Sequence, residues 1–150
     1  MILVSACLIG QNVRYDGNNS LNEKIRRLMD EGKAIAVCPE VFGGLSIPRL
    51  PAEIEHGDGH DVLEGKSKIV DTSGKDVTEE FLKGAYETLD VFKEFQPSMV
   101  VLKENSPSCG SSFIYDGTFS GNKIQGAGVT TALLEKNGIH VISEKEFEAL

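Results

Sequence analysis

Three cysteines are the residues of this chain whose side chains suggest the most distinctive chemistry. Cys7, Cys38 and Cys109 are its only cysteines, and each follows a run of apolar, strand-forming residues. Thiolates bind soft metals and iron–sulfur clusters, and a thiolate is also a nucleophile. An odd count makes a disulfide framework a poor explanation, and no pair has the spacing of a zinc knuckle or a redox dithiol. Taken singly, each cysteine is best explained as a small buried hydrophobe. Whether this explanation holds for all three depends on where the fold places them.

Polar side chains accompany two of the cysteines. Glu40 follows Cys38 by two residues in Cys-Pro-Glu, and Ser106 and Ser108 precede Cys109. In isolation, Glu40 is explained as a solvated loop carboxylate, and the two serines as turn residues around a proline.

Other charged residues carry a weaker signal. Arg14, Asp16 and Arg49 are better explained as loop-bracing ion pairs than as substrate ligands. The histidines have no helical or strand spacing to another ligand, so we interpret them as surface or structural residues; they are His56, His60 and His140.

Apolar runs alternate with helical patterns along the chain. Buried strands are predicted over residues 2–6, 34–37, 98–104 and 139–143. Helices are predicted over residues 20–32, 78–95, 127–138 and 143–150. Capping boxes Ser20/Glu23 and Ser143/Glu146 begin two of them, and Thr78 is expected to cap another. Residues 43–66 show no sustained period and predict a long excursion, while 67–77 and 113–124 predict hairpins or irregular loops.

This alternation predicts an α/β fold with three layers, α/β/α, of a Rossmann-like or flavodoxin-like kind. The mainly parallel sheet is expected to have the strand order 2-1-3-4. Ligands of such sheets bind beyond the carboxyl ends of the strands, where the strand order reverses. Cys7, Cys38 and Cys109 all follow strands at that edge, so we expect their thiols to converge on one site.

Composition narrows the class of protein. We expect residues 1–150 to form a single domain, since a chain of this length can bury a substantial core. The net charge of −8 argues against binding to a nucleic acid polymer or an anionic membrane. There is no signal peptide and no apolar stretch of about 20 residues, so a cytoplasmic location is expected.

Three interpretations of the cysteines compete. In the first, they hold an iron–sulfur cluster, and three ligands would leave one iron open. In the second, Cys7 is the nucleophile of a phosphatase-like enzyme, but Arg14 comes one residue too late for the Cys-x₅-Arg loop of low-molecular-weight tyrosine phosphatases. In the third, the chain is a non-catalytic metal- or cluster-binding protein or has a three-cysteine zinc site, which leaves Glu40 without a role.

Long motifs resemble those of a known family. The segments "VSACLIGQNVRYDG", "CPEVFGGLSIPRLPAEI", "VDTSGKDVT", "LKENSPSCG" and "IYDGTFSGNKIQGAGVTTALL" look like the signatures of a small bacterial family, long catalogued as a domain of unknown function, that includes the thiouracil desulfidases. The resemblance spans nearly the whole chain. It implies a 4Fe–4S cluster bound by Cys7, Cys38 and Cys109, with Glu40 and Ser106 as catalytic residues.

The resemblance also implies the reaction. A small thiocarbonyl compound, such as a thiolated pyrimidine base or its nucleoside, would lose its sulfur as hydrogen sulfide without electron transfer. The open iron would bind the substrate sulfur, Glu40 would position or deprotonate water, and Ser106 would donate a hydrogen bond or relay a proton. The chain is therefore expected to be an iron–sulfur-dependent desulfidase.

Overall fold

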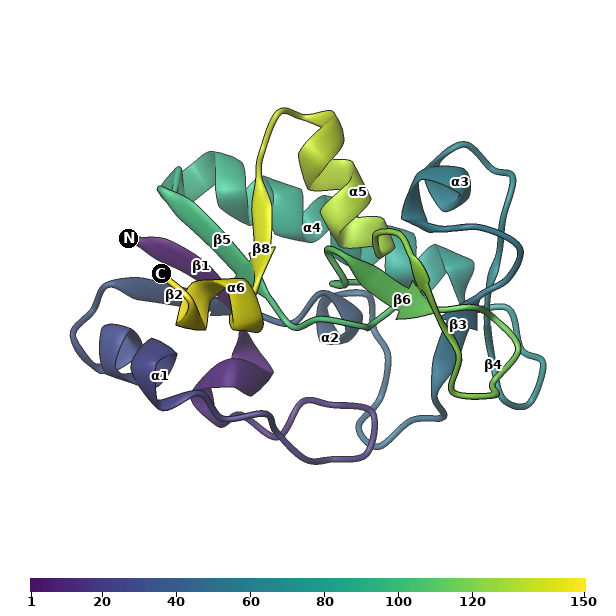
Figure 1. Cartoon of the computed structure of the whole chain (residues 1–150), viewed down its shortest axis with the longest axis horizontal. Coiled ribbons are helices and arrows are strands. Elements are labelled where there is room, and N and C mark those ends of the chain that lie inside the picture. The colour runs from purple at the N-terminus through teal and green to yellow at the C-terminus, as the bar shows by residue number, and fades with distance from the viewer.

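The four predicted buried runs form one parallel sheet. A computed structural model describes all 150 residues, and Figure 1 shows the arrangement of its elements. The strands of this sheet are β1 (Ile2–Ser5), β2 (Ala34–Val37), β5 (Met99–Leu102) and β8 (Val141–Ser143). Their order is β2-β1-β5-β8, and every neighbouring pair is parallel. The predicted strand order is confirmed.

Helices cover both faces of this sheet. The larger core joins one face to α4 (Thr78–Phe95) and α5 (Val129–Lys136), and the smaller core joins the other face to α1 (Glu23–Asp30) and α6 (Glu144–Glu148). Alternation along β1 explains the division: Leu3 belongs to the larger core, and Val4 to the smaller. The predicted three-layer α/β/α architecture is confirmed. No helix combines the length and apolar character needed to cross a membrane.

Small elements gather beyond the carboxyl ends of the parallel strands (Figure 1). Two antiparallel pairs form there, β3 (Ala52–Ile54) with β4 (Ile69–Asp71) and β6 (Phe113–Tyr115) with β7 (Lys123–Gln125). Short helical segments complete this region: the 3₁₀ helix η1 (Ala6–Ile9), α2 (Pro39–Phe42) and α3 (Gly59–Leu63).

Some local predictions were wrong or incomplete. Residues 43–66 contain β3 and α3, which are too short to show a period in sequence. Residues 67–77 do form the predicted turn, with an antiparallel bridge between Val70 and Asp76, but the sequence did not show that β4 also pairs with β3. The N-cap of α1 is Asn22 rather than Ser20; the Asn22 side chain accepts a hydrogen bond from the Ile25 amide.

The predicted N-terminal caps of α4 and α6 have different outcomes. Thr78 is the first residue of α4 and not its cap, since its hydroxyl accepts a hydrogen bond from the Ile69 amide at 2.9 Å. The capping box of Ser143 and Glu146 at α6 is present as predicted.

Close backbone packing places α2 against α4. A Cβ added to Gly84 would lie 1.8 Å from the Pro39 carbonyl oxygen, and one added to Gly43 would lie 1.9 Å from the Glu80 carbonyl oxygen. Only glycine permits such an approach. Because α2 begins directly after Cys38 and contains Glu40, this contact sets the position of both residues.

Candidate active site

One cavity lies at the carboxyl edge of the parallel sheet and contains all three cysteines. Its volume is about 600 Å³, within the range of small-molecule sites. Cys7 comes from η1, Cys38 from the end of β2, and Cys109 from the loop after β5. Three chain segments that are far apart in sequence therefore bring one thiol each to the same cavity.

The thiols of Cys7 and Cys109 are buried, that of Cys38 is partly buried, and the three affect one another electrostatically. Burial, followed by the neighbouring Cys38, raises the pKa of Cys7 to about 12. Burial also raises the pKa of Cys38, and burial followed by Glu40 and Cys38 raises the pKa of Cys109. A nucleophilic cysteine needs a lowered pKa, so these surroundings oppose the phosphatase-like interpretation of Cys7.

The loop that carries Cys109 is attached to the start of α5. The carbonyl oxygens of Pro107, Ser108 and Gly110 accept hydrogen bonds from the amides of Val129, Thr130 and Gly128, each at 2.8 Å. These bonds satisfy amide groups at a helix start that have no partner within the helix. The start of α5 thus fixes the backbone around Cys109.

The two serines before Cys109 have different surroundings. The Ser108 hydroxyl is fully buried and lies 2.7 Å from the Thr130 hydroxyl. The Ser106 oxygen accepts hydrogen bonds from the amides of Ser108 at 3.0 Å and Cys109 at 2.7 Å. Ser106 also borders the cavity, and its hydroxyl proton is donated to no protein acceptor, so it is free for a ligand.

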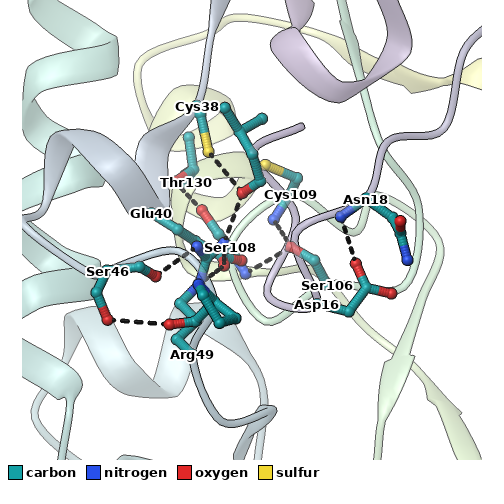
Figure 2. Close-up of polar contacts among 12 residues, drawn as sticks. Asp16, Asn18, Cys38, Glu40, Ser46, Arg49, Ser106, Ser108, Cys109 and Thr130 are labelled. Atoms are coloured by element: carbon teal, nitrogen blue, oxygen red, sulfur yellow. Dashed lines mark hydrogen bonds and ion pairs between the residues drawn. The ribbon is translucent and has the colours of Figure 1, made fainter. Parts of the chain in front are cut away.

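Glu40 is held by Arg49 at the cavity wall (Figure 2). The Nε atom of Arg49 donates to Oε2 of Glu40 at 3.0 Å, and Nη2 donates to the same oxygen. The side chains of Arg49 and Glu40 are only 9% and 15% exposed. Glu40 is therefore not a solvated loop carboxylate, and its Oε1 atom is left without a protein partner beside the cavity.

Arg49 also joins two loops. Its guanidinium donates to the carbonyl oxygens of Val13 and Ser46, each at 3.1 Å. Its backbone amide donates to the carbonyl oxygen of Tyr15 at 2.7 Å. The expected loop-bracing ion pair is found for Arg49, with Glu40 as its partner.

Arg14 and Asp16 form no ion pair. Arg14 donates to the Ser20 hydroxyl at 3.2 Å and lies over the Tyr15 ring, while Asp16 accepts from the Asn18 amide at 3.0 Å. The three histidines are exposed.

Comparison with known proteins assigns the family. A sequence model of the family described as 2-thiouracil desulfurase matches residues 2–146. The chain belongs to this family. The resemblance drawn from the five motifs is confirmed, and the family is one of enzymes.

Two similar proteins extend the comparison across the chain. The protein YbbK of Bacillus subtilis (strain 168), described as uncharacterized, is 60% identical over 146 residues, which are 97% of each chain. The solved structure of TudS, a [4Fe-4S]-dependent thiouracil desulfidase, is 46% identical with a TM-score of 0.87, and the match covers 99% of this chain and 93% of that chain.

Several charged residues that line the cavity of this desulfurase-family protein were not predicted from the sequence. Lys103 and Glu104 follow β5 and line the cavity, and Lys103 pairs with Glu144 at 2.9 Å. Glu104 accepts hydrogen bonds from four backbone amides, three of them in residues 111–113. Burial opposes its charge, but these amides lower the pKa of Glu104 overall. The available signal was that Lys103 and Glu104 end the strand predicted over residues 98–104, at the edge of the sheet where ligands bind.

Glu53 was also missed. It lies in β3, is 8% exposed and lines the cavity. The interval 43–66 carries no periodic pattern, so only the motif that contains Glu53, residues 38–54, drew attention to this segment, and it gave the carboxylate no role.

No three His, Cys, Asp or Glu side chains are arranged to bind a single metal ion. The three thiols instead surround part of a larger cavity. This arrangement fits a polynuclear cluster better than a three-cysteine zinc site, in which the sulfurs would lie about 2.3 Å from one ion.

Proposed function

We propose that this protein removes the sulfur of a small thiolated pyrimidine base or nucleoside as hydrogen sulfide, using a 4Fe–4S cluster bound by Cys7, Cys38 and Cys109. The observation that carries the proposal is the presence of three thiols, Glu40 and Ser106 on one cavity of about 600 Å³. The family match and the likeness to TudS support the same reaction. Residues 1–150 would act as one desulfidase-like domain.

The donor set fits the proposed cofactor. Thiolates are the usual ligands of iron–sulfur clusters, and a cubane with three protein ligands keeps one iron free. When bound, the cluster would supply a Lewis acid, its open iron, for the sulfur of the thiocarbonyl group. Metal binding would also keep the three thiols deprotonated, which their surroundings otherwise oppose.

Glu40 would act on water. Arg49 engages Oε2, so the orientation of the carboxylate is fixed while Oε1 remains able to accept a proton. A water molecule hydrogen-bonded to Oε1 would be held for attack on the thiocarbonyl carbon. Its oxygen would become the carbonyl oxygen of the product, its protons would leave with the sulfide, and no electron would be transferred.

Ser106 would contact the substrate through its free proton. Its oxygen is already used by the amides of Ser108 and Cys109, which aligns the hydroxyl group. Donation of this proton to the substrate would stabilise charge that develops as the carbon–sulfur bond breaks.

The substrate is expected to be a small molecule. The cavity is large enough for a cluster together with a base or nucleoside, and its lining mixes apolar and polar residues. The net charge of −8 disfavours a nucleic acid polymer.

Anaerobic purification tests this proposal. The protein, loaded with iron and sulfide, should contain about four iron atoms per chain and release sulfide from 2-thiouracil. Cys7→Ser, Cys38→Ser and Cys109→Ser should each lose most of the iron and all activity, because loss of one of only three ligands cripples the cluster. Ser112→Ala, outside the cavity lining, serves as the control and should keep both.

The phosphatase-like alternative predicts another pattern. It requires hydrolysis of an aryl phosphate that Cys7→Ser abolishes and that the other two cysteine variants retain. A loaded wild-type protein that releases no sulfide from any thiolated pyrimidine would contradict the desulfidase proposal.

A further inference from the structure

Glu53 is a carboxylate of the cavity wall that the proposed reaction does not use. Its Oε1 atom accepts hydrogen bonds from the amides of Gly117 at 2.9 Å and Phe119 at 3.2 Å. These bonds brace the loop between β6 and β7 against β3. The loop fits closely, since a Cβ added to Gly117 would lie 2.5 Å from the Ile54 carbonyl oxygen. The position of the carboxylate is therefore fixed by its surroundings.

The second oxygen of Glu53 has no partner. All hydrogen bonds that the protein donates to this side chain fall on Oε1, and Glu53 takes part in none of the ion pairs. The only fully buried unpaired side-chain atom is Oε2 of Glu80, so Oε2 of Glu53 keeps some accessible surface. Glu53 is 8% exposed and lines the cavity, so the cavity is open space that this oxygen can reach.

An unpaired carboxylate oxygen in such a place calls for a donor. Hydrogen bonds to charged groups are stronger than those between neutral groups, so a donor placed at this oxygen gains a strong bond. Its negative charge also disfavours anionic groups at this position. The oxygen is thus suited to a neutral ligand group that donates an N–H or an O–H.

We propose that Glu53 accepts a hydrogen bond from the substrate and selects thiocarbonyl compounds that carry a suitable donor. This inference rests on the proposed function. In a thiolated base the donor is a ring N–H, and in a nucleoside it is a ring N–H or a ribose hydroxyl. Either source gives Oε2 the same kind of bond, while Oε1 continues to hold the loop.

The inference is tested with substrates in which one hydrogen-bond donor is methylated or removed, here called blocked substrates, and with a matched pair of variants. Cluster-loaded protein is assayed with 2-thiouracil and its 1-methyl and 3-methyl derivatives, and with 2-thiouridine and its 2′-deoxy and 3′-deoxy forms. Glu53→Gln keeps an oxygen for the Gly117 and Phe119 amides but replaces the free acceptor by an NH₂ donor. Glu55→Gln, nearby and outside the cavity lining, is the control. Iron content and thermal unfolding are measured for each protein.

For the wild-type protein and Glu55→Gln, removal of the donor that contacts Glu53 should lower kcat/KM about 10- to 100-fold. Glu53→Gln should lose a similar factor on the unblocked substrate, mainly through KM, and should no longer distinguish blocked from unblocked compounds. Calorimetric binding of uracil, uridine and their N-methyl and deoxy derivatives to the loaded protein gives a readout without turnover. If only the methylated bases lose kcat/KM and affinity, the donor to Glu53 is the ring N–H. If only the deoxynucleosides lose them, the donor is a ribose hydroxyl.

Equal kcat/KM for all compounds in the wild-type protein would overturn the inference, as would a Glu53→Gln variant that behaves like Glu55→Gln. If Glu53→Gln unfolds early, the binding series on the wild-type protein decides: equal affinities for all uracil and uridine derivatives overturn the inference. Absence of sulfide release from every compound would instead contradict the proposed function itself.

Discussion

At the scale of single residues, the pairing of Glu40 with Arg49 gives the two oxygens of one carboxylate different surroundings. Both guanidinium contacts fall on Oε2, which leaves Oε1 without a protein partner. The same arginine reaches the loops at residues 13–15 and 46, so the orientation of Glu40 depends on how these loops fold. In the proposed role of base, a carboxylate held this firmly would need little reorganisation when the reaction begins.

Glu40→Gln tests this role. The amide keeps an oxygen that can accept from Arg49 but has no basic carboxylate, so sulfide release should fall about 10²-fold or more. Glu40 is not proposed as an iron ligand, so iron, sulfide and the brown colour of the anaerobic variant should match those of the wild-type protein. A variant with its cluster and near-full activity would show that water is activated elsewhere. Loss of the cluster would show that Glu40 is structural or a ligand.

At the scale of elements, the contact between α2 and α4 positions the residues around Cys38. Gly84 of α4 faces the Pro39 carbonyl, and Gly43 at the end of α2 faces the Glu80 carbonyl. Pro39 at the first position of α2 suits a helix start. Because α4 spans 18 residues and packs widely in the core, it provides a rigid support for a four-residue helix.

Gly84→Ala tests this contact. In an exposed helix interior, alanine in place of glycine stabilises a protein by about 0.5–1 kcal/mol. Here the new methyl group would meet backbone at 1.8 Å, so we expect the free energy of unfolding to fall by about 2 kcal/mol or more. Urea denaturation measures the change, with the exposed Lys83→Ala as control, expected within about 0.5 kcal/mol. A stabilised Gly84→Ala variant would contradict the close approach.

At the scale of the whole molecule, the proposed ligands join segments that are distant in sequence. Cys7, Cys38 and Cys109 follow three neighbouring strands of the main sheet. A cluster bound to all three would connect the segment after β1, the segment after β2 and the loop that is attached to α5. Since such a site exists only in the folded chain, binding free energy adds to the free energy of unfolding.

Thermal unfolding under nitrogen measures this linkage. The cluster-loaded wild-type protein should unfold at a higher temperature than the cluster-free protein, by several degrees for each kcal/mol gained. Cys38→Ser, treated in the same way, should show little difference between the two preparations. Equal unfolding temperatures for loaded and cluster-free wild-type protein would contradict ligation by all three segments.

The main sheet and its helical layers could be predicted from the sequence, because apolar runs and helical periodicity act locally and the order of parallel strands follows from right-handed crossovers. The capping box at Ser143 was found for the same reason. The edge at which the cysteines lie also followed, since Cys7 and Cys38 come within two residues of a strand end and Cys109 lies in the loop after the third strand. Motif resemblance supplied the family and the suggested roles of Glu40 and Ser106.

Only the tertiary structure decided how the cavity wall is built. The strand β3 pairs with β4, Arg49 with Glu40, and Glu53 with the loop after β6, and each is a contact between segments without a local pattern. Three-residue strands and four-residue helices are too short to show a period, so long-range packing selects them. The free oxygen atoms of Glu40 and Glu53 arise from such contacts, because which lone pairs remain unused depends on where the rest of the chain places its donors.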